Sequence, residues 1–321
     1  MTRVRAFVAV TVVCVLTAGG AIASAVLGAD SGEASGRVAD VLSGGPALVY
    51  RSLDKATRDR VAVAPLDGGA ATLSALRCER VHFSAGTGLC VARGGGFAGA
   101  FRAQVFGPDG RVRHELELAG IPSRARVSRE GRLGAVTMFV TGHSYAAAGS
   151  FSTETTLIEL ATGTALGTLE QFTVSHNGRV VTAEDMNFWG VTFAPGGDRF
   201  YATLATGGET YLVHGSVRDR TMRTLYENVE CPSLSPDGTR IAYKKRVRTR
   251  DTPWRLTVLD LATMRETPLA EMRGFDDQAE WLDDDRVLYG MDGEVRVVPA
   301  DGSGAPQKFR SAGDSPAVAR G

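Results

Sequence analysis

Residues 231–246 read CPSLSPDGTRIAYKKR, two short apolar segments joined by the turn Ser235-Pro236-Asp237-Gly238. Pro236 presets the backbone φ angle of a tight turn, Asp237 can accept hydrogen bonds from nearby backbone, and Gly238 tolerates a positive φ. The flanking segments have the composition of half-buried strands. The stretch therefore predicts a β-hairpin in which Asp237 holds the turn and is not a catalytic acid.

The same plan recurs along the chain, with an apolar residue, a small residue, a polar turn and an apolar strand. It is found at 82–92, 126–136, 192–203 and 280–290, and the turns begin at Ser84, Ser128, Ala194, Ser235 and Leu282. The spacings are 44, 66, 41 and 47 residues, and the 66 equals one period plus an insertion of about 20. A period of about 40 to 50 residues built from short strands indicates the blades of a β-propeller.

A further pair of strands follows each hairpin, as in RVAVAPLDGG (60–69), so one period contains four strands. Residues 46–77 supply only three strands, and residues 314–321 supply one that has no blade of its own. We therefore expect Pro316–Arg320 to close the N-terminal blade by pairing beside Ala47–Arg51, because such closure removes open sheet edges.

The expected fold is all-β, a six-bladed β-propeller of four-stranded antiparallel blades over residues 45–321. Five blades are expected at 78–122, 123–185, 186–227, 228–273 and 274–313, with the sixth formed by the two chain ends.

The segment PSLSPDGTRIAY (232–243) resembles the repeat of TolB-like, WD40-like β-propellers of bacterial exported proteins. The resemblance extends over residues 46–321. It implies a rigid wheel that serves as a binding platform, and it implies no particular activity because one fold supports many functions.

The N-terminal segment forms a separate region. A short basic start precedes an uncharged apolar run at residues 6–28. Residues 1–28 are either a signal peptide, cleaved after the small residues 23–25, or an uncleaved membrane anchor. Both alternatives place the rest of the chain outside the cytoplasm, secreted or anchored to the cytoplasmic membrane. The small, polar residues 29–44 are predicted to be a flexible linker.

Composition excludes some classes of function. The chain has 36 basic and 36 acidic side chains, and this balance argues against a nucleic-acid binder or a membrane-surface binder. No histidine or cysteine pair has zinc-ligand spacing, so we expect neither a metal site nor a cofactor. The segment GHSYA (142–146) resembles the nucleophile elbow of hydrolases, but it lacks the final glycine and the sequence context that an elbow requires.

The cysteines after the apolar run are Cys78, Cys90 and Cys231, an odd number for an oxidising compartment. A hairpin turning near Gly86 would place Cys90 opposite His82, with Cys78 roughly 13 Å further along the strand. Because a disulfide needs Cα atoms within about 7 Å, no disulfide is expected.

Unusual loop sequences suggest where a partner binds. Loops between the second and third strands of each blade, and connections between blades, share one face of a propeller. The stretches 141–153, 174–190 and 244–254 are expected on that face. The candidate binding residues are His143, Tyr145, Asn187, Trp189, Lys245, Arg246, Arg248, Arg250 and Trp254. Arginine and aromatic side chains are enriched at binding hot spots.

These features favour a non-catalytic extracytoplasmic binding or scaffold protein of the bacterial cell envelope. We expect a monomer that binds an envelope protein, or another polar or acidic ligand, at this face. Two alternatives remain open, a propeller enzyme acting on sugars or peptides and the extracytoplasmic sensor domain of a membrane complex. A retained anchor would favour the sensor, and a cluster of carboxylates in the central channel would favour the enzyme.

Overall fold

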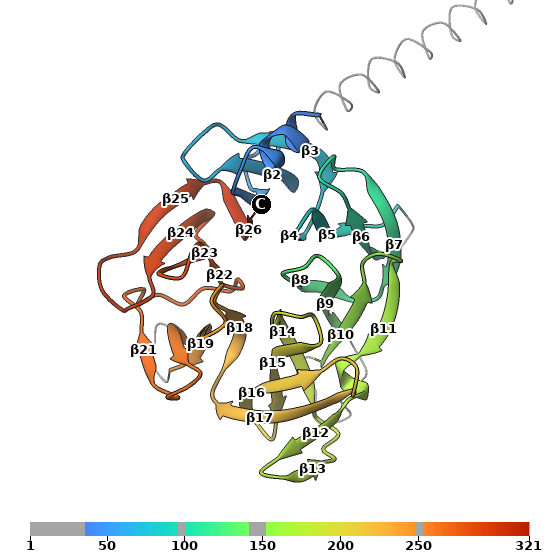
Figure 1. Ribbon diagram of the computed structural model, residues 1–321, viewed down its shortest axis with the longest axis vertical. Helices are drawn as coiled ribbons and strands as arrows, with labels where there is room; N and C mark the ends of the chain where they lie inside the picture. The colour runs from blue at the N-terminus through green and yellow to red at the C-terminus, as the bar shows by residue number, and fades with distance from the viewer. Residues whose placement is uncertain (1–35, 96–99, 141–151, 248–252, 321) are drawn as a thin grey trace, which may run out of the picture.

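The computed structural model describes residues 36–95, 100–140, 152–247 and 253–320. In these ranges the strands form six sheets arranged as blades around one axis (Figure 1). The predicted six-bladed β-propeller is therefore confirmed. Within the same ranges, no helix has the length and apolar composition needed to cross a membrane.

Each blade has four antiparallel strands, which run outward from an inner strand at the axis. The inner strands are β4 (Arg80–Ser84), β8 (Ile121–Val127), β14 (Asn187–Phe193), β18 (Glu230–Leu234), β22 (Glu280–Trp281) and β26 (Gly313–Ala319). The second strands are β5 (Thr87–Arg93), β9 (Leu133–Val140), β15 (Arg199–Thr206), β19 (Arg240–Arg246), β23 (Arg286–Met291) and β1 (Ala47–Ser52).

The third strands are β6 (Phe101–Phe106), β10 (Ser152–Glu159), β16 (Glu209–Ser216), β20 (Trp254–Asp260), β24 (Glu294–Pro299) and β2 (Arg60–Pro65). The outer strands are β7 (Val112–Leu118), β11 (Thr164–Thr168), β17 (Thr221–Glu227), β21 (Glu266–Pro268), β25 (Gln307–Ser311) and β3 (Thr72–Arg77).

The turn that predicted the fold has the expected chemistry. Gly238 has a φ of 75°, and its N–H donates to the carbonyl of Ser235 at 2.9 Å. The Asp237 carboxylate accepts from the backbone N–H of Thr239 at 3.0 Å. Burial acts to raise the pKa of Asp237, but the hydrogen bonds from Ser235 and Thr239 outweigh it and lower the pKa to about 2. This aspartate therefore stabilises the turn as a carboxylate.

The ring closes as predicted. The last strand, β26, pairs with β1 in an antiparallel register that includes Ala47 with Ala319 and Arg51 with Asp314. The Arg51 guanidinium also forms a bidentate ion pair with the Asp314 carboxylate. Arg51 Nε donates to Asp314 Oδ1 at 2.8 Å, and Arg51 Nη2 donates to Asp314 Oδ2. Bidentate pairs of this kind fix geometry as well as adding energy, so they hold the two chain ends in one register.

Counting the closing blade of β26 and β1–β3 as the first, the predicted insertion forms an addition to the fourth blade, that of β14–β17. A 3₁₀ turn, η1 (Leu169–Gln171), leads into β12 (Thr173–His176) and β13 (Arg179–Val181). β12 runs parallel to β17, so this hairpin widens the blade to six strands at its outer edge (Figure 1). The first part of the stretch 174–190 therefore lies far from the axis.

The prediction of a flexible linker at residues 29–44 is wrong for its second part, residues 36–43. Residues 36–43 form a helix, and Val38 is 3% exposed. Val38, Val41 and Leu42 pack against the apolar cluster of the first two blades, which gives this segment a fixed place. The predicted signal or anchor at 1–28, and linker residues 29–35, lie outside the described residues.

The core lies between neighbouring blades. One apolar cluster joins Leu133 and Leu157 of the third blade to Phe188 and Phe200 of the fourth, and all four side chains are at most 1% exposed. Burying a side chain of this size stabilises by roughly 1.5–3 kcal/mol, so each interface holds its two blades firmly. The blades thus form a rigid support for the residues along the axis.

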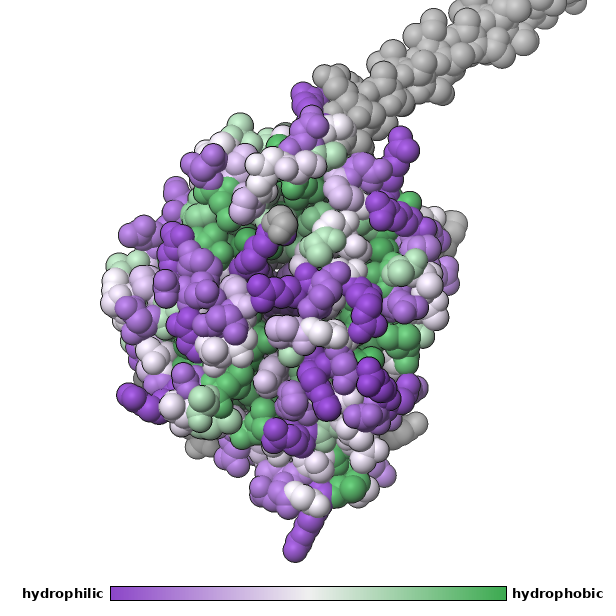
Figure 2. Space-filling model, in the orientation of Figure 1, coloured by the Kyte–Doolittle hydropathy of each residue, from purple (hydrophilic) through white to green (hydrophobic). Residues whose placement is uncertain are grey.

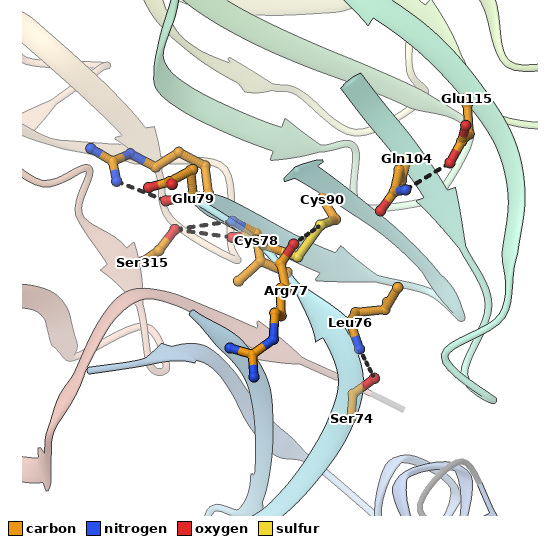
Figure 3. The surroundings of a disulfide bond; sticks show 11 residues. Ser74, Leu76, Arg77, Cys78, Glu79, Cys90, Gln104, Glu115 and Ser315 are labelled. Atoms are coloured by element: carbon orange, nitrogen blue, oxygen red, sulfur yellow. Dashed lines mark hydrogen bonds between the residues drawn. A yellow bond between two sulfur atoms is a disulfide. The ribbon is translucent and has the colours of Figure 1, made fainter. Parts of the chain in front are cut away.

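The prediction that no disulfide forms is also wrong. Cys78 and Cys90 are bonded, with Cα atoms 5.4 Å apart (Figure 3). Two features of the hairpin explain the error. The tight turn puts Cys90 opposite Val81 instead of His82. Cys78 also lies before β4 begins, in the turn after β3, so the rise of a straight strand does not apply to it. Cys231 is a buried free thiol.

Candidate functional site

A polar channel follows the axis of the propeller. Three hollows follow one another along this channel, and neighbouring hollows share lining residues. Arg80 and Asp277 line both the first and the second hollow, and His82 and Arg126 line both the second and the third. Hydrophilic side chains gather around the centre of the face in Figure 2, over the inner strands of Figure 1. We call the end at which the inner strands begin the loop mouth, and the end at which they finish the turn mouth.

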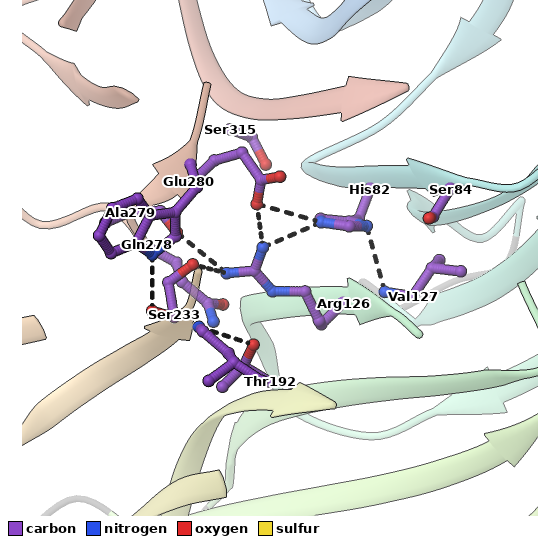
Figure 4. Close-up of polar contacts among 12 residues, drawn as sticks. His82, Ser84, Arg126, Val127, Thr192, Ser233, Gln278, Ala279, Glu280 and Ser315 are labelled. Atoms are coloured by element: carbon purple, nitrogen blue, oxygen red, sulfur yellow. Dashed lines mark hydrogen bonds and ion pairs between the residues drawn. The ribbon is translucent and has the colours of Figure 1, made fainter. Parts of the chain in front are cut away.

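A buried cluster of charges crosses the channel near the turn mouth (Figure 4). His82 comes from β4, Arg126 from β8 and Glu280 from β22, and each is 6% exposed. Arg126 Nη1 donates a hydrogen bond to Glu280 Oε2, and Arg126 Nη2 donates one to the carbonyl of Ala279 at 3.0 Å. His82 Nε2 lies 3.5 Å from Glu280 Oε2. Three blades are thus connected through one carboxylate.

The hydrogen bonds determine how this cluster is protonated. The backbone N–H of Val127 donates to His82 Nδ1 at 3.2 Å, and His82 Nε2 lies 2.9 Å from Arg126 Nη1 as well as 3.5 Å from Glu280 Oε2. Burial and the charge of Arg126 lower the pKa of His82, which is therefore neutral at pH 7. Burial acts to raise the pKa of Glu280, but Arg126 and the hydrogen bond from His82 lower it to about 2.

The loop mouth contains a cavity of about 310 Å³, whose charged lining residues are Arg80 and the four aspartates Asp276, Asp277, Asp292 and Asp314. Arg124 and Lys244 beside it are buried, with side chains 6% and 3% exposed, and both contact Asp276 Oδ1, at 2.7 and 3.2 Å. The Asp276 side chain itself is 71% exposed. Arg80 lines the cavity and donates to the carbonyls of Ser123 and Glu79. Two buried cations at this mouth therefore share one exposed counter-ion.

A backbone cradle holds Asp277 at the same mouth. Its carboxylate accepts N–H hydrogen bonds from Gln278 at 2.9 Å, from Gly290 at 3.1 Å and from Ser315 at 3.0 Å. A Cβ atom on Gly290 would lie 2.4 Å from Asp277 Oδ2, so only glycine fits there. Burial, and then the charge of Asp314, raise the pKa of Asp277. Asp277 ties the last complete blade to the closing strand β26.

Solved structures share this fold. The chain superimposes on TolB from Acinetobacter baumannii with a TM-score of 0.57 and 18% identity, over 85% of this chain and 66% of that one. A TolB candidate from Agrobacterium tumefaciens gives 0.50 and 12%, over 84% and 91%. A chain of the nidogen/laminin complex gives 0.56 and 11%, over 85% and 98%.

The chain has the β-propeller fold of the TolB structures. The predicted resemblance to TolB-like propellers is therefore confirmed for the fold. The chain spans just under two thirds of the Acinetobacter TolB. No family model matches the sequence. No curated protein matches it either.

The predicted binding residues have mixed positions on this propeller. His143, Tyr145, Arg248 and Arg250 lie outside the described residues. Asn187 and Trp189 belong to the inner strand β14. The Asn187 amide oxygen accepts the backbone N–H of Thr153 in the neighbouring blade at 2.7 Å, and the Trp189 side chain is buried, at 7% exposed.

The remaining predicted residues lie together on the hairpin of β19 and β20, where Arg246 pairs with Trp254. Lys245 forms an ion pair with Glu266, and Arg246 one with Glu230 at 3.0 Å. The Trp254 ring lies 4.4 Å from Lys244 Nζ. Lys244, Lys245 and Arg246 were expected in a basic loop, but they are strand residues, and carboxylates of the same fold neutralise their charges.

The sequence analysis missed the channel residues, although the sequence contained a signal for them. In each repeat, the residue two places before the turn either lines the turn mouth or accepts a hydrogen bond from a residue that lines it. These residues are His82, Arg126, Thr192, Ser233 and Glu280. Side chains alternate along a strand, so residues at this position share one face, which is directed to the axis. Among the described residues, no group of three or more His, Cys, Asp or Glu side chains could hold a metal ion.

Proposed function

We propose that the protein is a non-catalytic extracytoplasmic binding protein whose loop mouth takes a polar or acidic partner. The observation that supports this most directly is the arrangement of Arg124 and Lys244, two buried cations beneath one exposed carboxylate. Arg80 lines the adjoining cavity together with four aspartates, of which Asp314 is already paired with Arg51 and Asp292 with Arg273.

The electrostatics favour an acidic group on the partner. Asp276 is exposed, so water screens its attraction to the cations beneath it more than it would in the interior. A partner carboxylate that contacts Arg124 and Lys244 beside Asp276 would add a second counter-ion for these two cations. Burial lowers the pKa of Arg80, and the charges of Asp277 and Asp314 act against this shift.

The location is part of the proposal. The basic, then apolar residues 1–28 support export, and the Cys78–Cys90 disulfide is compatible with an oxidising compartment. We propose an extracytoplasmic position at the cell envelope, where a rigid wheel presents its loop mouth to a partner. Cell fractionation tests this, because a cytosolic protein would contradict it.

Binding can be tested by capture from envelope extracts. We compare the wild-type protein with Arg80→Gln, because the Arg80 side chain lines the loop-mouth cavity. The matched control is Arg179→Gln, an exposed residue on the outer hairpin of the fourth blade. The proposal expects one partner whose capture falls with rising salt and falls in Arg80→Gln but not in the control. Equal capture by all three proteins would refute it.

A further inference from the structure

The turn mouth, at the opposite end of the axis, is a funnel of about 70 Å³ to which all six blades contribute. Each inner strand, or the turn that follows it, contributes at least one residue to the lining of the funnel. These residues are His82, Arg126, Thr192, Ser235, Glu280 and Val318. A site built from six rigid blades has a fixed shape, so little ordering is needed when a ligand enters.

Charge in this funnel is unbalanced. Arg126, Arg129 and Arg320 line it against the single carboxylate of Glu280, which leaves an excess of two positive charges because His82 is neutral. The Arg320 side chain is 37% exposed, and one of its nitrogens donates to the carbonyl of Trp281. Arg126 Nε is buried and has no hydrogen-bond partner in the described part of the chain. The funnel therefore offers guanidinium N–H groups to an anion.

An apolar groove of about 410 Å³ adjoins the funnel. Its apolar walls are Pro46, Leu66, Leu282, Phe309 and Val318, which come from the last blade and the closing blade. The groove and the funnel share Pro236, Val318 and Arg320, so they are continuous. Two acidic residues line the groove: Asp283 is paired with Arg286, and the Asp284 carboxylate accepts the backbone N–H of Asp237 at 3.0 Å. Funnel and groove together therefore retain an excess of one positive charge, and Arg320 lies at their junction.

We propose that the turn mouth binds a monocarboxylic acid with an apolar body, with the carboxylate in the funnel beside Arg320 and the apolar body in the groove. This site is independent of the proposed function, which concerns the loop mouth.

The chemistry of the two halves selects this occupant. A guanidinium binds a carboxylate with two parallel hydrogen bonds, and the excess positive charge of the funnel disfavours an ammonium group. The groove would desolvate an apolar chain and so favours it over a hydrophilic one. Free acyl acids and peptides with an apolar C-terminal residue share this chemistry.

Calorimetric titration with octanoate, octan-1-ol and octylamine tests the assignment on the purified protein in buffer free of detergent and carboxylates. We expect octanoate to bind one to one, and the alcohol and the amine to bind at least about tenfold more weakly, because they lack the charge-assisted hydrogen bonds. Octan-1-ol or octylamine binding as tightly as octanoate would overturn the proposal. Binding of acetate as tight as that of octanoate would equally overturn the role of the groove.

Two variants locate the site. Arg320→Gln should weaken octanoate binding at least about tenfold, and Phe309→Ser should weaken octanoate but not acetate. Arg179→Gln on the outer hairpin is the matched control and should bind as the wild type does. Unchanged octanoate affinity in Arg320→Gln would overturn the proposal, and equal melting temperatures would show that the variants are folded.

A second pair of ligands distinguishes the sources of the carboxylate. The tripeptide Gly-Gly-Leu with a free C terminus is compared with its C-terminal amide. Tighter binding of the free tripeptide than of octanoate would assign the site to peptide C termini, and the reverse would assign it to acyl acids. Both results support the carboxylate site, whereas equal binding of the amide and the free acid would count against it.

Discussion

Replacing Glu280 with glutamine should test the buried charge cluster directly. The substitution keeps the size of the side chain but removes the negative charge between Arg126, His82 and Arg320. Packing is therefore almost unchanged, and the loss of stability measures electrostatics. The Arg126 guanidinium would remain buried with only carbonyl, hydroxyl and amide oxygens around it.

The pKa of Glu280 gives the size of the effect. A carboxyl whose pKa is about 2 in the folded protein, against an ordinary value near 4.5, stabilises the fold by roughly 3 kcal/mol at neutral pH. Removing one partner of a buried ion pair typically costs about 3–5 kcal/mol, which agrees with this figure. We expect Glu280→Gln to lower the free energy of unfolding by about 3 kcal/mol at pH 7.

The dependence on pH has a definite sign. The lowered pKa means that the unfolded chain takes up a proton at Glu280 before the folded protein does, as pH falls from about 4.5 toward 2. Wild-type stability from this group is complete above that window and is lost within it. The difference between wild type and variant should therefore shrink to roughly half by pH 3. The lowered pKa of His82 acts in the same direction in both proteins, below about pH 6.5.

Urea denaturation at pH 7 and pH 3 measures both quantities, provided that two spectroscopic probes give coincident transitions. The control is Glu115→Gln, which removes an exposed ion pair with Arg102 and should cost about 0.5 kcal/mol. A loss below about 1 kcal/mol for Glu280→Gln at pH 7 would refute the argument. So would a difference that is the same at both pH values.

Three further outcomes follow from single contacts. Asp277→Ala leaves three backbone N–H groups without their acceptor and should cost about 3 kcal/mol by urea denaturation. Replacing Cys78 and Cys90 by serine opens a link across 12 residues and should cost about 2–3 kcal/mol, and a wild-type protein whose melting temperature is unaffected by reductant would contradict this. Gly88→Ala should lower the melting temperature, because the new Cβ would lie 2.1 Å from the Phe106 ring, and overpacking of this kind costs about 1–3 kcal/mol.

The fold could be predicted because its signals are local. The turn chemistry of Pro236, Asp237 and Gly238 depends on neighbouring residues alone, and its recurrence set the number of blades. The closing strand could be predicted because the two ends of the chain supplied complementary parts of one blade. The disulfide depended on where a strand begins and on a register shift of one residue, and boundaries of that precision are not encoded in the strand pattern.

The candidate sites depended on distant contacts. The period of the strands could have indicated that His82, Arg126 and Glu280 face the axis. Their pairing could not be predicted, because it depends on which blades meet across the channel. The basic stretch at 244–254 was overrated as a binding site for the opposite reason. Its positive charges are evident from the sequence, but the carboxylates that pair with them are not. Its described cations Lys244, Lys245 and Arg246 are paired with carboxylates that lie on other strands and connections, which are Asp276, Glu266 and Glu230.

The closing strand β26 connects the two mouths. Asp314 and Ser315, at its beginning, take part in the contacts of the loop mouth, and Val318 and Arg320, at its end, line the turn mouth and the groove. A ligand that needs the closed ring stabilises it by about 2.7 kcal/mol at one hundred times its dissociation constant. That is comparable to the loss expected when the Asp277 cradle is removed. Occupation of either proposed site would therefore be coupled to closure of the ring through β26, because a bound ligand would add to the free energy that keeps β26 paired with β1.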